Sequence, residues 1–255
     1  MNKAILIVAG IVGLNVLSAH GWAGKKLSFE RDLSLDADGI SEFKVDAGAG
    51  VLILTGESVE EITVRATIKS HDADDVDELK DMAAKYLDLN LEENGRRAKL
   101  TSLVENKWFG NNNMSVDLEI TIPRDMNVEI RDGSGSMEVM NIDGDLDIDD
   151  GSGSMFVKDI TGEVFIDDGS GEMDIINIGS DLKIDDGSGS LKIDNVAGSV
   201  RVDDGSGELV AYGIGGDFTV DDGSGSIKIE DLKGEFNLIS GGSGSIRVNG
   251  KRYDD

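Results

Sequence analysis

A hexapeptide of aspartates, glycines and serines recurs through the second half of the sequence, and its residue types are those of candidate catalytic or binding sites. The first copy, DDGSGS at residues 149–154, returns every 18 residues as DDGSGS or DDGSGE. Such a stretch offers carboxylates for a metal ion, a serine for nucleophilic attack and a glycine-rich backbone for a phosphate. The same residues are also typical of a tight turn, because aspartate can accept backbone hydrogen bonds and glycine tolerates positive φ.

Composition and repetition disfavour an enzyme. A serine nucleophile needs a base within hydrogen-bond reach, and the chain has two histidines, His20 and His71, and no cysteine. A phosphate would be repelled by the two carboxylates in each copy, and the loops lack the lysine of a phosphate-binding loop. An active site is built once, whereas this motif recurs. We therefore expect no catalysis, with a polysaccharide lyase on a β-helix as the third and most distant interpretation.

Calcium binding is the main alternative to a purely structural turn. If the repeats stack in register, ionised aspartates about one strand spacing apart repel by on the order of 1 kcal/mol. Calcium would relieve this repulsion, and so would backbone hydrogen bonds in Asx-turns, which we favour. The residue order differs from that of calcium-binding β-roll repeats and of EF-hands. The candidate metal ligands are Asp149, Asp150, Asp167, Asp168, Asp185, Asp186, Asp203, Asp204, Asp221 and Asp222.

The 18-residue repeat itself predicts the fold. Each unit carries two short alternating apolar segments, such as Met155–Val157 and Val164–Ile166. Alternation of period two indicates strands with one buried face, which no single unit could bury alone. Units stacked with a rise of roughly 4.8 Å per coil would share one core. We predict an all-β, single-stranded β-helix (a β-solenoid) with 18-residue coils, regular over residues 132–255.

Residues 24–131 are less regular but still β-rich, and we expect them to cap and continue the solenoid. One segment, residues 72–87, predicts a short helix, because apolar residues recur there at helical spacing after an acidic start. Such a helix could cover an end or side of the solenoid. The candidate strands are Lys26–Leu35, Glu42–Val45, Val51–Leu54, Ile62–Ile68, Ala98–Leu103 and Val116–Ile122.

One loop before the repeats is a candidate partner contact. Trp108 and Phe109 are adjacent aromatics in an asparagine-rich stretch. Aromatic side chains in exposed loops are typical recognition anchors, although the loop could instead fold its tryptophan onto the core.

The N-terminus predicts export, and the net charge limits the partners. Lys3 precedes an apolar run that ends at Leu17, and small residues flank a cleavage site near Ala23. Residues 1–23 therefore have the layout of a signal peptide, and we expect a periplasmic or secreted protein that does not span the membrane. Without cysteine, packing rather than disulfides must hold the fold. A formal net charge of -27 argues against nucleic acid and anionic membrane surfaces as partners, because both would repel the chain.

The segment Leu118–Ile130, which reads LEITIPRDMNVEI, leads directly into the Gly-Ser-Gly turns. With these repeats, residues 40–249 resemble the DUF4097 family, whose members are labelled "putative adhesins" with β-strand repeats. The resemblance implies a single-stranded β-helix in the bacterial cell envelope with no enzymatic activity. It also implies an adhesin-like scaffold or binding module for an unknown envelope or surface ligand, without a cofactor other than the calcium considered above.

Overall fold

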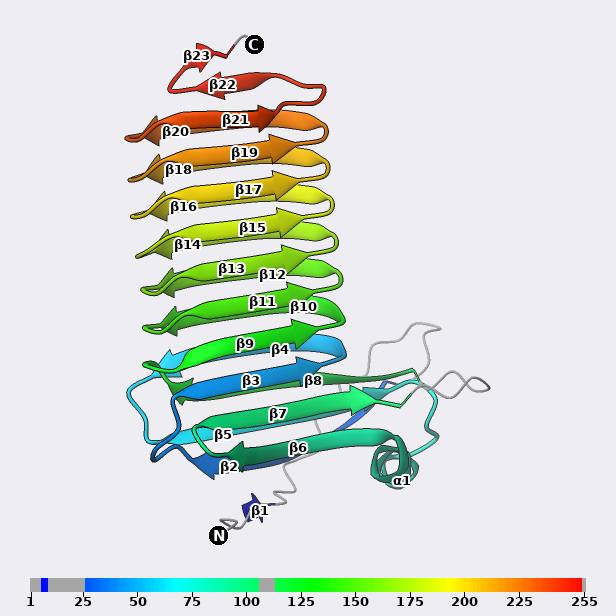
Figure 1. Ribbon diagram of the computed structural model, residues 1–255. Helices are drawn as coiled ribbons and strands as arrows, with labels where there is room; N and C mark the ends of the chain where they lie inside the picture. Colours follow the sequence, from blue (N-terminus) through cyan, green and yellow to red (C-terminus); the bar gives the residue numbers. More distant parts are fainter. Residues whose placement is uncertain (1–5, 9–25, 106–112, 254–255) are drawn as a thin grey trace.

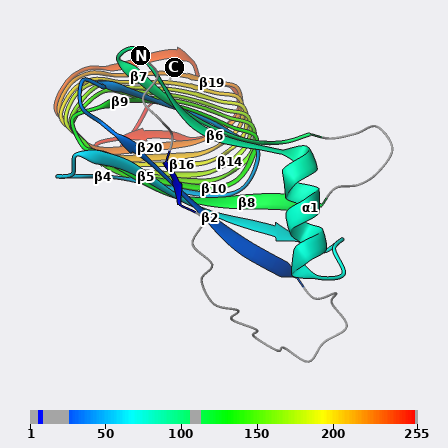
Figure 2. The ribbon, with the colours of Figure 1, turned by 90° about the horizontal axis from the view of Figure 1, so that it is seen from below.

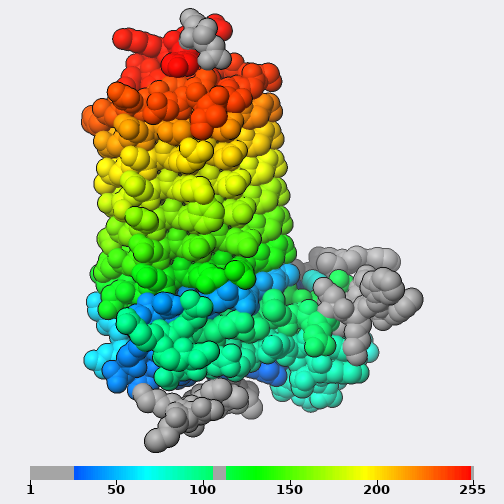
Figure 3. All heavy atoms as spheres, in the orientation of Figure 1, coloured from blue at the N-terminus to red at the C-terminus, as the bar shows by residue number. Residues whose placement is uncertain are grey.

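The computed structural model describes residues 6–8, 26–105 and 113–253. Two sheets face each other along one axis, and successive strands of the repeat region alternate between them (Figure 1). This arrangement is the β-solenoid that the repeat predicts. Figure 3 shows the coils packed into a continuous column from the N-terminal part to the last repeats.

In the repeat region, each coil contributes one strand to each sheet, and all neighbouring strands from β9 to β22 are parallel. The first sheet, sheet A, contains β10 (Ser134–Ile142), β12 (Gly153–Ile160), β14 (Gly171–Ile178), β16 (Gly189–Val196), β18 (Gly207–Ile214), β20 (Gly225–Leu232) and β22 (Ile246–Val248). The second, sheet B, contains β9 (Asn127–Asp132), β11 (Leu146–Asp150), β13 (Val164–Asp168), β15 (Leu182–Asp186), β17 (Val200–Asp204), β19 (Phe218–Asp222) and β21 (Phe236–Ser240).

The N-terminal part extends both sheets and introduces antiparallel pairs. Sheet A gains β2 (Leu27–Asp36), β4 (Ala49–Glu57), β5 (Glu61–Ser70) and β8 (Met114–Pro123), and sheet B gains β3 (Glu42–Ala47), β6 (Leu87–Asn94) and β7 (Arg97–Val104). The pairs β2–β5, β5–β8 and β6–β7 are antiparallel, whereas β3 and β4 already run parallel to the first regular coil. Two short strands, β1 (Leu6–Val8) and β23 (Lys251–Arg252), end sheet A.

The predicted helix is present as α1 (Val76–Tyr86). It begins later than expected because the Asp75 side chain accepts a hydrogen bond from the Glu78 N–H and so caps the first turn. Buried Leu79 and Ala83 hold it against β2, β5 and β6. Figure 2 shows α1 beside the column rather than across its open end. Among the described residues, no helix is long and apolar enough to cross a membrane.

The core is a single apolar filling between the two sheets. Apart from the aspartate that ends each sheet B strand, the inward residues of the regular strands are apolar, as at Ile175, Ile184 and Val202, which are at most 1% exposed. Because strands pair in register, each of these apolar side chains stacks on an apolar one in the next coil. This stacking buries the face that a lone unit would expose.

Two kinds of corner hold the coils in register. The second glycine of each turn pairs with its equivalent in the next coil, and a Cβ at Gly171 would lie 1.6 Å from the Gly153 carbonyl oxygen. Only glycine permits this close approach. The second corner has a left-handed residue inside the sheet A strand, where Asn195 Nδ2 donates to Asn177 Oδ1 at 2.9 Å. Short polar side chains tolerate that conformation and bond along the stack.

Candidate functional site

The aspartate pairs form the two rows that stacking predicts, but the rows lie on opposite faces of sheet B. Register aligns each aspartate with its equivalent in the next coil. Consecutive residues of a strand point to opposite faces, so one row is inside and the other outside. The inner row is Asp150, Asp168, Asp186, Asp204 and Asp222; the outer row is Asp149, Asp167, Asp185, Asp203 and Asp221.

The inner row is buried in the solenoid beside the turns. Its five side chains belong to residues that are only 1–3% exposed. At Asp186, the Ser188 N–H donates to Oδ1 at 3.0 Å, which is the Asx-turn expected for a purely structural motif. The other oxygen of Asp186 has no hydrogen-bond partner among the described residues, and at Asp168 neither oxygen has one. The inner row therefore stabilises the turns, and it also leaves buried carboxylate oxygens without hydrogen bonds.

Burial and stacking shift the pKa of these carboxyls upwards. Loss of water is the larger cause, and the neighbouring aspartates of the row add to it. The pKa of Asp186 rises to about 7, and the pKa values of Asp168 and Asp204 rise to about 6. The pKa is also raised at Asp150 and Asp222 by burial. Half-buried Asp132, which pairs with Asp150, begins the row with a pKa raised to about 6.

The outer row projects into solvent along the column. Four of its aspartates are exposed and Asp221 is half-buried. Across the described residues, no group of three or more histidine, cysteine, aspartate or glutamate side chains is placed to hold a metal ion. Calcium binding by the ten aspartates stays a prediction, but the two rows cannot join in one site because sheet B separates them.

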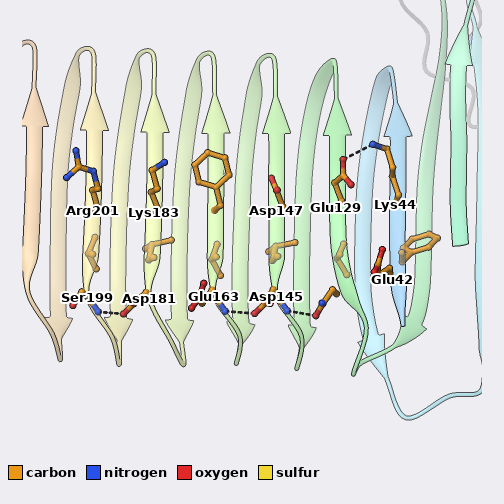
Figure 4. Close-up of a pocket in the computed structure, with 18 of the residues that line it drawn as sticks. Glu42, Lys44, Glu129, Asp145, Asp147, Glu163, Asp181, Lys183, Ser199 and Arg201 are labelled. Atoms are coloured by element: carbon orange, nitrogen blue, oxygen red, sulfur yellow. Dashed lines mark hydrogen bonds and ion pairs between the residues drawn. The ribbon is translucent and has the colours of Figure 1, made fainter. Parts of the chain in front are cut away.

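A shallow groove runs along the outer face of sheet B and crosses the coils from β3 to β19 (Figure 4). Its volume is about 730 Å³. One outward side chain from each strand lines it, and register stacks these side chains into a single row. In chain order this groove row is Lys44, Glu129, Asp147, Phe165, Lys183, Arg201 and Thr219.

Charges change sign along the groove row. At the N-terminal end, Lys44 Nζ lies 2.6 Å from Glu129 Oε1, and this contact is the main reason that the pKa of Glu129 is lowered. Asp147 follows, with a pKa raised first by burial and then by the Glu129 charge. Further along, Lys183 Nζ lies 4.6 Å from the centre of the Phe165 ring. Within the described part of the chain, the Arg201 guanidinium forms no ion pair.

Side-chain to backbone hydrogen bonds join neighbouring coils along one edge of the groove. At several coils the residue beside the start of the sheet B strand accepts from the backbone N–H of its equivalent in the next coil, as when Asp145 Oδ1 accepts from Glu163 N at 2.9 Å. Asp181 Oδ1 accepts from Ser199 N at 2.7 Å in the same way. These bonds, dashed in Figure 4, fix the spacing of the polar groups that line this edge.

Two candidate binding features, the Trp108–Phe109 loop and the groove, could not both be compared with an expectation from the sequence. Trp108 and Phe109 lie outside the described residues, so their role stays a prediction. The groove was not predicted from the sequence. Its signal in the sequence is the outward row that holds Phe165 between acidic and basic residues.

Two proteins of known structure are similar to this chain, and the first shares its fold. A "putative adhesin" from Bacteroides fragilis matches with a TM-score of 0.53 and 18% identity, over 87% of this chain and 97% of that one. A "putative cell adhesion protein" from Clostridium sporogenes matches with a TM-score of 0.36 and 15% identity, over 83% and 99%. Curated proteins give no match. The family model described as Toastrack DUF4097 matches residues 57–252, and the chain therefore belongs to this family.

Proposed function

We propose that this protein is a non-catalytic, exported binding module of the bacterial cell envelope, and that it holds an extended neutral polysaccharide in the groove of sheet B. The groove carries this proposal because it is open along its length and crosses many coils. A compact ligand would fill only part of such a surface, whereas a chain-like ligand could contact a row of equivalent positions. Toastrack membership and the adhesin names of similar structures agree with a binding role.

The groove offers the contacts that a sugar chain requires. Phe165 is half-buried, so one part of its ring stays free to pack against the apolar face of a sugar. Carboxylates at Asp145, Asp147 and Glu163 surround it and can accept hydrogen bonds from hydroxyl groups. Lys183 and Arg201 supply donors on the other side. The groove thus offers a sugar chain an aromatic ring, hydrogen-bond acceptors and hydrogen-bond donors.

A neutral polymer fits the electrostatics better than an acidic one. The formal net charge of the chain is -27, and the outer aspartate row runs beside the groove. An anionic polysaccharide would be repelled at long range even though Lys183 and Arg201 lie in the groove. A hydroxyl-rich neutral chain avoids that cost and can still use the carboxylates as acceptors.

Repetition supports a role in binding rather than in catalysis. Glycoside hydrolysis requires a pair of carboxylates with different environments on either side of one bond. In this groove, Asn127, Asp145 and Asp181 each use a side-chain oxygen to accept from the backbone N–H of the next coil, so the two acidic members share one structural role with an amide. Equivalent positions of this kind suit repeated contacts with a polymer.

Binding can be tested with soluble neutral oligosaccharides and a matched pair of variants. The probes are cellohexaose, laminarihexaose and chitohexaose, with an alginate hexasaccharide as the anionic comparison, measured by isothermal titration calorimetry. Phe165→Ala removes the ring from the groove, whereas Phe156→Ala removes a half-buried ring from the outer face of sheet A. We expect a neutral probe to bind, with affinity reduced about tenfold by Phe165→Ala and unchanged by Phe156→Ala.

Two results would contradict the groove proposal. One is the absence of binding to all neutral probes, and the other is equal binding by the two phenylalanine variants. Preferential binding of the alginate probe would retain the groove but reject the neutral ligand.

Export is tested separately by sequencing the N-terminus of the protein recovered from its native cells. Removal of residues 1–23 would leave Gly24 as the first residue. Recovery of a chain that still begins at Met1 would reject a cleaved signal peptide.

A further inference from the structure

The most unusual chemistry in the molecule is inside the solenoid, away from the groove. The inner row places five carboxyl groups in the apolar interior, on residues no more than 3% exposed. Carboxylates are rarely buried without a compensating charge or hydrogen bonds. Here one or both oxygens of every member lack a hydrogen-bond partner among the described residues. Such free oxygens point to a ligand that satisfies them.

The surroundings of the inner row supply no positive charge. The charged groups that act on its members are carboxylates: the neighbours in the row, and the outer-row aspartates one residue away. Opposite them, the buried inward residues of the sheet A strands from β12 to β20 are apolar, as at Met155, Met173 and Leu191. The turn contributes only backbone N–H groups, such as that of Ser188. Neutralisation must therefore come from outside the protein.

A proton fits this site better than a metal ion. Calcium takes six to eight oxygen ligands, as a rule, and needs them to surround it. The described residues hold no cluster of three or more acidic, histidine or cysteine side chains in position for a metal. A proton requires only two oxygens, and register pairs the backbone of each inner aspartate with that of the next one, with both side chains on the inward face.

We propose that the inner row is a proton-binding column, in which a carboxylic acid on one coil donates its O–H to an unpartnered carboxyl oxygen on the next. Each proton taken from water neutralises one buried charge and supplies one missing hydrogen bond. Loss of these protons would leave adjacent buried carboxylates that repel each other through a medium of low dielectric constant. The stack of coils is therefore held together most firmly when the column is protonated.

The expected pH dependence follows from the direction of the pKa shifts. The folded pKa is raised at every member, to about 6 or 7 at Asp168, Asp186 and Asp204. The folded protein then binds more protons than the unfolded chain between about pH 4 and pH 7, and stability falls as pH rises through that window. Ordinary acid denaturation has the opposite sign, so the two behaviours are distinguishable.

The chain provides a charge-matched control for this proposal. Asp186→Asn with Asp204→Asn removes two inner carboxylates, and Asp185→Asn with Asp203→Asn removes two outer ones from the same strands. Both double variants change the net charge equally. Thermal unfolding is followed in EDTA at several pH values from 5 to 7.5.

We expect the Tm of the unchanged protein to fall on the order of 5 °C from about pH 5 to about pH 7.5. The outer double variant should keep most of this fall. The inner double variant should lose most of it and melt above the outer variant at the upper pH. The proposal would be overturned if the Tm of the unchanged protein did not fall over this pH range, or if it fell equally in the two double variants.

Carboxyl titration by NMR and unfolding in calcium test the proposal independently of the pH dependence of the Tm. In the unchanged protein, labelled with carbon-13 at aspartate carboxyls, we expect NMR signals with titration midpoints of about 6 and about 7. If all aspartate signals titrate below about pH 5, the column is not protonated and the proposal fails. If millimolar calcium stabilises the protein and the inner double variant alone loses this effect, the inner row binds a cation instead.

Discussion

The two aspartate rows consist of the same residue on the same five strands, yet their environments are opposite. Asp185 and Asp186 are neighbours in the chain; one is exposed, and the other is 2% exposed inside the coil. The alternation of a β-strand is the whole cause of the difference. The comparison shows that a repeated motif need not have one function: its first aspartate presents charge to solvent, and its second closes the turn and carries the proposed proton site.

The inner row is tolerated because it lies at the turn. Turn N–H groups reach Asp186, whereas positions further into the strand face only apolar side chains. We expect Ile184→Asp, two residues earlier on the same inward face, to destabilise the protein by about 4 kcal/mol or more. Lys183→Asp, which places the same residue outside on the same strand, should cost about 0.5 kcal/mol.

Urea unfolding of both variants measures the two costs. Similar stability of the Ile184→Asp and Lys183→Asp proteins would contradict the assignment of inside and outside along β15.

The second glycine of each turn, three residues after the inner aspartate, sets how closely the coils approach. A Cβ at Gly171 would meet the Gly153 carbonyl oxygen, so Gly171→Ala must push two coils apart and disturb both aspartate rows. We expect a loss of about 2–3 kcal/mol, measured by thermal unfolding. The control is Gly95→Ala, where an added Cβ meets nothing within 4 Å and only the positive φ is strained. The control should cost about 1 kcal/mol. An equal loss at both sites would mean that close stacking is not what requires Gly171.

The smallest expected effect concerns calcium at the outer row. Exposed carboxylates at a regular spacing attract divalent cations by their charge, and this attraction is not specific to one ion. We expect calcium and magnesium at equal millimolar concentration to raise the Tm equally, by about 1–2 °C relative to EDTA. A larger, calcium-specific rise that Asp185→Asn with Asp203→Asn abolishes would establish the calcium site predicted from the sequence.

The repeat region could be predicted from the sequence almost completely, because an 18-residue period and strict alternation leave one way to stack the units. The irregular part was harder. Strand β6 was missed because its alternating leucines follow directly on α1, so Leu87 reads equally well as the end of the helix. The left-handed corners were also missed, although Asn141, Asp159 and Asn177 recur with the same period.

The candidate site was predictable only in part. Register, and hence the existence of two aspartate rows, follows from the repeat. Which row is buried follows from alternation, but the burial of Asp186 beside unsatisfied oxygens depends on where the turn begins. The groove is lined by residues of many coils, from β3 to β19, so no single repeat unit reveals it.

Proton release on unfolding tests most directly whether the inner and outer aspartates differ in proton binding. Calorimetric unfolding enthalpies are measured near pH 6 in buffers of different ionisation enthalpy, so that their difference counts protons. The account predicts that unfolding releases protons from the inner row, because aspartates of an unfolded chain are ionised at that pH. Enthalpies that are the same in all buffers, or a net uptake of protons, would contradict it.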